Sequence, residues 1–354
     1  MSALEKLKKN STIKESSIIT KSEIYNDAET DFVPTDDPMI NVALSADVDG
    51  GLSAGHTMLA GPSKHFKSMF GLLLAGAYLK EHKDATLLFY DNEFGTPDAY
   101  FKFFNIDTER VIHTPITNVE ELKHDIINQL NILEKGDKVI ILIDSIGNIA
   151  SKKEIDDALS GSDKADMTRA KQMKGLWRMV TPLLKMKNIP LISINHTYQT
   201  IEMFSKAVPS GGTGGIYSAQ NIWIIGRQQN KKAGQNLRGY NFIIRLEKSR
   251  WSREGSKIPI TVLFDGGIQK YSGLFEVGKE TGYINMPSRG WYEGVDATTG
   301  EVVTEKHRED DINESKEFWD TMWEKTDFKE HIKKIYSFET GTAETLFEGM
   351  EPDA

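Results

Sequence analysis

Residues 61–68 have the order of residue types that binds the phosphates of a nucleotide. They follow an apolar run at 57–61 and precede an apolar segment with helical character. At such a strand-to-helix turn, backbone N–H groups cradle the phosphates, a lysine reaches the β and γ oxygens, and a hydroxyl holds Mg²⁺. Lys67 and Ser68 are the predicted lysine and hydroxyl. The predicted nucleotide-binding residues of this loop are Gly61, Pro62, Ser63, Lys64, His65, Phe66, Lys67 and Ser68.

Phe66 departs from the usual phosphate-loop pattern, which has glycine at this position. A phenylalanine is expected to exclude backbone φ angles that only glycine tolerates and to add bulk beside the phosphates. Taken alone, the segment therefore fits either a nucleotide site or an ordinary strand-to-helix turn. His65 is expected to be a loop residue that faces solvent rather than a catalyst.

Two carboxylates at the ends of later apolar runs favour the nucleotide interpretation. The run at 139–145 contains Asp144 near its end, where a carboxylate would orient the metal ion and its water. Glu93 follows the run at 86–91, where it would polarise a water for attack on the γ-phosphate. The order of these motifs predicts ATP hydrolysis with Mg²⁺ held through Ser68 and Asp144, against the alternative of a purely structural α/β domain.

Short apolar runs alternate with helix-like segments from about residue 38 to 270. Continuous β-branched runs are typical of strands buried on both faces, and helices between them imply a mostly parallel sheet. The predicted fold class is therefore α/β, with an antiparallel edge made by the last two runs. The runs are 57–61, 86–91, 139–145, 190–195, 221–226, 242–246 and 259–264.

The two ends of the chain differ in pattern from this core. Residues 1–35 are polar with scattered leucines and isoleucines, which predicts one or two short helices that must dock on something. Residues 271–354 predict a small α/β domain with an acidic tail, and a hairpin at 291–303 with Thr299 and Gly300 in its turn. The expected domains are thus 1–35, 36–270 and 271–354.

Charge is unevenly distributed along the 354 residues, whose net charge is −9. Residues 164–253 hold 16 Lys and Arg against three acidic residues, whereas residues 305–354 hold 15 acidic residues against seven basic ones. A strongly basic stretch suits a polyanion such as nucleic acid. The alternative is that these cations are solvated or paired within an oligomer.

Composition excludes several other classes of protein. The absence of cysteine excludes disulfides, zinc sites built on cysteine and thiol catalysis, and the eight histidines lack metal-site spacing. No apolar run approaches the ~18 residues of a membrane span, and the first residues lack the apolar core of a signal peptide. We therefore expect a cytoplasmic protein with no membrane partner.

Taken together, these motifs resemble RecA-family recombinases, and especially the bacteriophage branch of that family. The resemblance covers roughly residues 35–340. It implies a RecA-type P-loop ATPase core, a short helical polymerisation arm at the N-terminus and a small α/β C-terminal domain. Phenylalanine in the phosphate loop is typical of the phage branch, so Phe66 supports the resemblance. The motifs that carry it are GPSKHFKS, LLFYDNEFGTP, IDSIGNIASKKE, DMTRAKQMK, INHTY, MFSKAV, GGTGG, LEKSR and FDGGI.

The resemblance also implies roles for individual residues, and bacterial RecA has glutamine where this chain has His196. The implied catalytic residues are Glu93 as base, Lys67 on phosphate, His196 with Asn195 as the γ-phosphate sensor, and Lys248 and Arg250 reaching a neighbouring subunit's ATP; Tyr100 matches the adenine-stacking position and Asp144 the Walker-B acid. The implied DNA-binding residues, on two loops, are Arg169, Lys171, Lys174, Phe204, Lys206, Gly211, Gly212 and Thr213.

Alternative roles remain open for these residues. His196 would otherwise be a satisfied core polar group, Lys248 and Arg250 a solvated hairpin face, and the DNA segments ordinary mobile loops.

The function implied is that of an ATP-dependent homologous recombinase. It would form a helical filament on single-stranded DNA, pair that strand with homologous duplex DNA and exchange strands. A recombination mediator and a single-strand-binding protein are the expected partners. Two alternatives are a hexameric helicase, which would need an N-terminal domain larger than 35 residues, and a DNA-binding regulator with a degenerate nucleotide site, for which Phe66 is the best argument.

Overall fold

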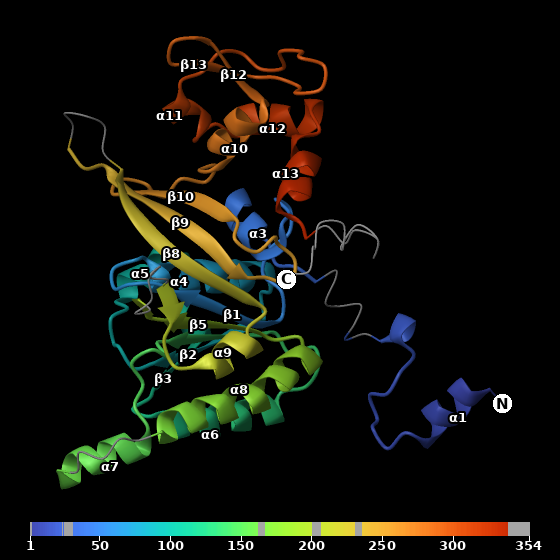
Figure 1. The fold of residues 1–354 in the computed structure, drawn as a ribbon, viewed down its shortest axis with the longest axis vertical. Coiled ribbons are helices and arrows are strands. Elements are labelled where there is room, and N and C mark those ends of the chain that lie inside the picture. Colours follow the sequence, from blue (N-terminus) through green and yellow to red (C-terminus); the bar gives the residue numbers. More distant parts are fainter. Residues whose placement is uncertain are drawn as a thin grey trace, which may run out of the picture.

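A nine-stranded sheet runs through the centre of the molecule (Figure 1). Its strand order is β11-β10-β9-β8-β1-β5-β4-β2-β3. The strands from β8 to β3 in this order pair in parallel, whereas β9, β10 and β11 pair antiparallel. The structure, a computed structural model, describes residues 2–22, 24, 31–161, 167–199, 207–230 and 236–338.

The bounds of the elements are as follows. The strands are β1 (Gly55–Ala60), β2 (Thr86–Asp91), β3 (Val111–Pro115), β4 (Val139–Asp144), β5 (Pro190–Asn195), β6 (Thr197–Gln199), β7 (Ala207–Pro209), β8 (Asn221–Asn230), β9 (Gly239–Lys248), β10 (Lys257–Leu263), β11 (Gly267–Ile268), β12 (Ile284–Ser288) and β13 (Trp291–Gly294). The helices are α1 (Ala3–Asn10), α3 (Pro38–Ser45), α4 (Lys67–Glu81), α5 (Asp98–Phe103), α6 (Val119–Ile132), α7 (Lys152–Ser160), α8 (Thr168–Met186), α9 (Thr213–Ser218), α10 (Leu274–Thr281), α11 (Glu309–Ile312), α12 (Lys316–Lys325) and α13 (Phe328–Tyr336), with 3₁₀ turns at Ile19–Lys21 and Thr108–Arg110.

The predicted α/β class is confirmed, because every apolar run that predicted a strand forms one. The central strands β1, β4 and β5 are buried at every position, as expected for strands covered on both faces. The antiparallel edge predicted for the last two runs is the pairing of β9 with β10. Within the described ranges, no helix is both long and apolar enough to cross a membrane.

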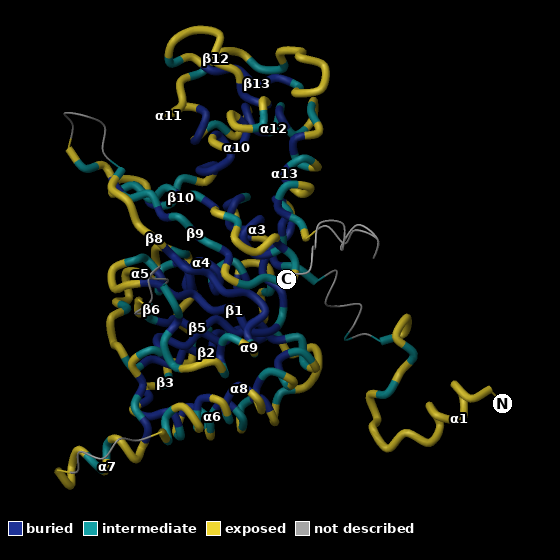
Figure 2. Tube along the Cα trace, viewed as in Figure 1, coloured by how far each residue is buried: buried dark blue, intermediate teal, exposed yellow. Residues whose placement is uncertain are grey.

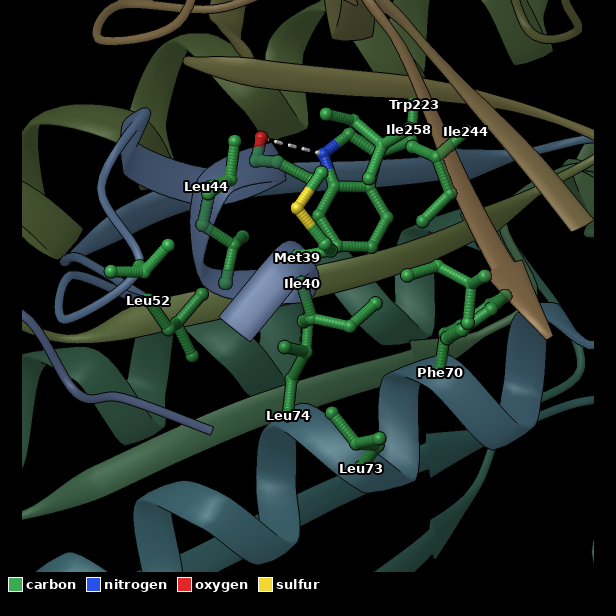
Figure 3. Packing of buried hydrophobic residues seen from close by; sticks show 14 of the residues in the cluster. Met39, Ile40, Leu44, Leu52, Phe70, Leu73, Leu74, Trp223, Ile244 and Ile258 are labelled. Atoms are coloured by element: carbon green, nitrogen blue, oxygen red, sulfur yellow. Dashed lines mark hydrogen bonds between the residues drawn. The ribbon is translucent and has the colours of Figure 1, made fainter. Parts of the chain in front are cut away.

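Two apolar cores lie on opposite faces of the sheet, and Figure 2 shows the sheet as the buried centre of the chain. One core contains α4 and α3, and the other contains α6 and α8. In the first, Trp223 of β8 donates its indole N–H to the carbonyl of Ala43 at 3.3 Å, beside Phe70 of α4 (Figure 3). This packing fixes α4, whose N-terminus carries the phosphate loop.

The N-terminal segment lies away from the sheet (Figure 1). Helix α1 begins with a capping box between Ser2 and Glu5 and buries none of its residues. Leu7 is 73% exposed and Ile13 is 62% exposed. The prediction of short helices is confirmed, and these exposed apolar side chains are the ones that a docking partner would cover.

The C-terminal residues form a small α/β unit above the sheet edge (Figure 1), with Trp319 and Phe328 in its core. The predicted hairpin at 291–303 is confirmed, because residues 292–295 bridge antiparallel to residues 302–307. Its turn is present, since Val295 and Val302 bridge and Gly300 has φ +75°. Strand β13 also pairs with the preceding strand β12, through a turn at Gly290. It therefore has an antiparallel partner on each edge.

A buried histidine joins β1 to the helix layer that covers it. His56 makes a 2.7 Å hydrogen bond to the hydroxyl of Ser193 on β5, and its ring stacks on Trp177 of α8 with 4.1 Å between ring centroids. Burial, together with the nearby Lys248 cation, lowers the pKa of His56 to about 3. The folded protein therefore holds this ring neutral.

We predict that acid destabilises the fold through His56. A lowered histidine pKa contributes stability that is present above the unfolded value of about 6.5 and is lost as the pH falls toward the folded value. Between pH 7 and pH 5, wild type should lose about 2 kcal/mol more of its free energy of unfolding than His56→Gln. Urea unfolding at the two pH values measures this, and equal losses would contradict the prediction.

Candidate nucleotide and DNA site

The phosphate loop joins β1 to α4 at the carboxyl end of β1. Lys67, the first residue of α4, is buried and donates from Nζ to the carbonyl of Pro62 at 2.8 Å. This bond curls the loop around the lysine. Burial lowers the pKa of the Lys67 ammonium, although the carboxylates of Glu93 and Asp144 act in the opposite direction. The cation is thus close enough to both predicted carboxylates to interact with them electrostatically.

Phe66 adopts the left-handed conformation with φ +61° and ψ +16°. The expectation that a phenylalanine would exclude such angles is wrong for this loop. Its ring lies 5.3 Å from both Phe70 and Phe242, measured between ring centroids. Aromatic packing of this kind offsets the ~1–2 kcal/mol that the left-handed region costs a residue with a Cβ. The loop therefore keeps the backbone shape that glycine usually supplies.

Ser68 and Asp144 face each other as a potential metal site. The Ser68 hydroxyl hydrogen-bonds the Asp144 carboxylate, and Asp144 Oδ1 is buried without a partner among the described residues. Burial raises the pKa of Asp144 to about 6 despite that hydrogen bond. An orphaned buried carboxylate oxygen beside a hydroxyl fits a hard divalent cation such as Mg²⁺. No group of three or more His, Cys, Asp or Glu in the described ranges could hold a metal ion by itself, so phosphate oxygens and waters would have to supply the remaining ligands.

Glu93 lies at the centre of a hydrogen-bonded cluster. Its Oε1 accepts from the Ser145 hydroxyl at 2.5 Å and from Asn148 at 3.2 Å, and it lies 2.9 Å from Nε2 of His196. Asn148 is also 3.0 Å from that same ring nitrogen. Burial raises the pKa of Glu93, but the bonds from Ser145 and His196 outweigh it, and the net result is a lowered pKa. The carboxylate is thus held ionised, as a base requires.

Asp91, the last residue of β2, shapes the turn that carries Glu93. Its Oδ1 accepts from the backbone N–H of Glu93 at 3.0 Å and of Phe94 at 2.8 Å. The other oxygen lies 3.3 Å from Nε2 of His113 on the edge strand β3. This turn directs the Glu93 side chain toward the ends of β4 and β5, where Ser145 and His196 are found.

Four residues of this site were missed by the sequence analysis. Ser145 directly follows Asp144, and that adjacency was the available signal. Asn92 accepts from the Ser145 backbone N–H at 2.5 Å, and Asn148 contacts Glu93 as described above. Arg227 on β8 donates to the carbonyl of Lys64 at 2.8 Å and lies over Tyr240. No sequence pattern marked these contacts, because they join segments far apart in the chain.

The three residues predicted to contact the base or a neighbour's nucleotide lie apart from the Glu93 cluster. Tyr100 on α5 is 37% exposed. Lys248, at the end of β9, donates to the carbonyls of Ile216 and Tyr217 at the end of α9, both at 3.0 Å. Arg250 is exposed two residues further on. In the single chain, Lys248 therefore stabilises α9 instead of facing solvent.

Five of the predicted DNA-binding residues line one cavity of about 650 Å³. Lys171 and Lys174 are exposed on α8, and Gly211 and Gly212 have φ of +89° and +81° before α9 begins at Thr213. A Cβ at Gly214 would come within 3.0 Å of the Lys174 backbone, so the two segments touch. The five lining residues are Lys171, Lys174, Gly211, Gly212 and Thr213.

Arg169 is not among the described residues that line this cavity. Phe204 and Lys206 lie outside the described residues. Arg169, at the start of α8, directs its guanidinium inward to the carbonyls of Ile149, Gly147 and Ile146. This geometry differs from the predicted phosphate contact, because hydrogen bonds within the chain already occupy two of its nitrogens.

The fold and site together define a P-loop ATPase of the doubly wound α/β class, with the phosphate loop, the acidic residues and His196 at the carboxyl ends of parallel strands. The chain belongs to the RecA family of ATP-dependent recombinases. The model for the RecA N-terminal domain matches residues 2–269, and the model described as "Bacteriophage T4, Recombination and repair protein, C-terminal domain" matches residues 271–332. The resemblance found in the motifs is therefore confirmed.

Individual relatives agree with this assignment. The chain is 48% identical over 335 residues to the recombination and repair protein (UvsX) of Enterobacteria phage T4. The aligned region covers 94% of this chain and 85% of that protein. It is 25% identical to Protein RecA of Streptomyces rimosus, over 73% of this chain and 67% of that protein. Protein RecA of Acidothermus cellulolyticus is 24% identical, over 75% and 74% respectively. RecA-family proteins act on DNA and form filaments.

We predict that the left-handed backbone at Phe66 can be measured by comparing two variants. Phe66→Ala and Phe66→Gly both lose the ring packing, but only glycine relieves the positive φ. Phe66→Gly should therefore be more stable than Phe66→Ala by about 1 kcal/mol, although both should be less stable than wild type. Chemical unfolding checks this, with Phe103→Ala, a 50% exposed aromatic on α5, as a surface control. Equal stability of the two variants would refute the left-handed loop.

Proposed function

We propose that this chain hydrolyses ATP when bound to single-stranded DNA and uses the nucleotide to control homologous pairing and strand exchange. The observation that carries the proposal is the 2.9 Å contact between Glu93 and His196. It joins the predicted base for hydrolysis to the residue from which the second DNA segment departs. Hydrolysis and DNA contact would thereby share one hydrogen-bonded cluster.

In the proposed reaction, Glu93 orients a water for in-line attack on the γ-phosphate and accepts its proton. Lys67 stabilises charge on the β and γ oxygens, with the backbone N–H groups of 61–68 around the phosphates. Mg²⁺ bound by Ser68 and Asp144 would supply charge neutralisation at those oxygens. The hydrogen bonds from Ser145 and Asn148 keep the carboxylate of Glu93 in one orientation, which preserves the attack geometry.

His196 is proposed to report whether the γ-phosphate is present. As Nε2 lies within 2.9 Å of Glu93, the imidazole has a partner when no phosphate is bound. A bound γ-phosphate offers it a stronger acceptor, and the ring would turn from the carboxylate to the phosphate. The Glu93 carboxylate would then be free to accept a hydrogen bond from the attacking water. The segment after His196 would move with the ring.

Lys248 and Arg250 are proposed to act on the ATP of a neighbouring subunit. In the single chain, Lys248 is bonded to the end of α9. Assembly would transfer its three donors to phosphate oxygens and release α9, which borders the DNA cavity. Cations supplied across an interface make hydrolysis depend on assembly. Tyr100 is proposed to stack on the adenine, where its exposed ring is accessible.

The filament and its partners follow from the same proposal. Head-to-tail contacts that do not close generate an open helix, with the arm at 1–35 docked on the next subunit's core at 36–270. The proposed DNA contacts are Lys171, Lys174, the glycines at 211 and 212, and Thr213, with Phe204 and Lys206 outside the described residues. Homologous duplex DNA, a mediator and a single-strand-binding protein are the proposed partners, in the cytoplasm of a host cell. The acidic tail from about residue 340 would compete with duplex DNA for the basic surface.

We predict that two substitutions separate nucleotide binding from hydrolysis. Glu93→Gln should still bind ATP but lose 10²–10⁴-fold of its turnover with single-stranded DNA, since the amide cannot accept the proton. Lys67→Ala should lose ATP binding as well as turnover. ATP hydrolysis and nucleotide binding, each with and without single-stranded DNA, measure this. Glu109→Gln, on an exposed 3₁₀ turn, is the matched control. Absence of turnover in wild type would overturn the proposed function.

We predict that the lysines of the cavity neutralise phosphates. For single-stranded DNA, log K should fall with log salt by about 0.7 for each phosphate contacted. Lys171→Gln and Lys174→Gln should each reduce that slope by about 0.7, whereas Lys83→Gln, an exposed lysine beyond the end of α4, should leave it unchanged. Binding titrations over about 50 to 300 mM salt measure this slope. A slope that neither cavity lysine alters would exclude this surface as the DNA site.

A further inference from the structure

Arg169 holds the turn at 146–149, which follows strand β4. Its Nε donates to the carbonyl of Ile149 at 2.6 Å, and its Nη2 donates to the carbonyls of Gly147 at 2.7 Å and Ile146 at 3.3 Å. The planar guanidinium thereby spans both sides of one turn. A lysine has a single ammonium and cannot bridge acceptors spaced in this way.

The turn held by Arg169 carries part of the proposed catalytic cluster. Ser145, just before it, bonds Glu93, and Asn148 within it contacts both Glu93 and His196. A Cβ at Gly147 would lie 2.6 Å from the His196 ring, so the turn packs directly against the sensor. Any displacement of this turn therefore moves the donors that orient the Glu93 carboxylate.

The helix that carries Arg169 also borders the DNA cavity. Lys171 and Lys174 lie on the same helix, within two turns of Arg169. Further along it, a Cβ at Gly215 of α9 would meet the indole nitrogen of Trp177 at 3.1 Å. The cavity is thus lined by α8 itself and by the start of α9, which packs on α8, and α8 is attached to the turn at 146–149 through Arg169.

We propose that Arg169 is a positioning residue that transmits DNA binding at the α8–α9 cavity to the Glu93 cluster, rather than a phosphate ligand. DNA seated on the cavity shifts the start of α8, the guanidinium carries that shift to residues 146–149, and Asn148 realigns against Glu93 and His196. This inference deepens the proposed function and depends on it. The proposed path from bound DNA to the Glu93 cluster consists of the Arg169 side chain and the backbone turn at 146–149.

Two substitutions distinguish Arg169 as a phosphate ligand from Arg169 as a positioning residue. A phosphate ligand needs a cation at this position, which Arg169→Lys keeps and Arg169→Gln removes. A clamp on three carbonyls needs the planar fork, which both substitutions remove. Arg178→Lys is the matched control, because Arg178 is an exposed arginine further along the same helix.

The experiment measures two quantities for wild type, Arg169→Lys, Arg169→Gln and Arg178→Lys. One is the ratio of ATP turnover with saturating single-stranded DNA to turnover without it. The other is the salt slope of single-stranded DNA binding. We expect the turnover ratio to fall about tenfold in both Arg169 variants, with the salt slope unchanged from wild type. Arg178→Lys should keep the wild-type turnover ratio and the wild-type salt slope.

The opposite pattern would overturn the inference. If Arg169→Lys keeps the wild-type ratio and Arg169→Gln loses about 0.7 of the slope, Arg169 is a phosphate ligand. If wild type itself shows no stimulation by DNA, the proposed function fails and this coupling fails with it.

A second measurement uses the unaltered protein and does not depend on how well the variants fold. Hydrogen exchange of the backbone amides at 145–150 should change by severalfold when single-stranded DNA is added without nucleotide. An unchanged exchange rate in this segment, with protection appearing around residues 171–174, would count against transmission through Arg169.

Discussion

The Glu93 carboxylate is the point on which the rest of this site depends. Three strand ends meet there, because β2 leads to Glu93, β4 to Ser145 and β5 to His196. Parallel pairing in the order β5-β4-β2 brings those ends to one edge of the sheet, where no single segment could supply the contacts. A carboxylate that accepts several hydrogen bonds is held ionised and oriented at the same time. The sheet order is therefore what assembles the proposed catalytic cluster.

The fold was largely predictable from the sequence because its signal is local. Buried parallel strands such as β4 are continuous β-branched runs, and their burial on both faces produces that pattern. Strand β3 was missed, since it is a largely exposed edge strand with only two consecutive β-branched apolar residues, in the sequence Val-Ile-His-Thr-Pro. The hairpin after β13 was predicted from its turn residues, but the second pairing of β13, with β12 through the turn at Gly290, was not.

The site was predictable only where one segment carries the chemistry. Lys67, Ser68, Glu93 and Asp144 are marked by loop pattern or by position after a strand. The contacts of Asn148 and Arg169 are not, since each joins segments about 20 to 55 residues apart in the sequence. An arginine in a basic stretch predicts a phosphate contact by composition alone, and only the fold shows that its donors face backbone carbonyls.

Phe66 shows why departure from a motif is weak evidence against function. The phosphate loop needs a backbone shape, and glycine is merely the least costly way to obtain it. Here Phe70 and Phe242 surround the ring and stabilise the same left-handed shape from the apolar core. Since Phe242 lies on β9, which ends at Lys248, the loop is also packed against the strand that carries the proposed interfacial cation. A glycine would give the loop its conformation but not this connection.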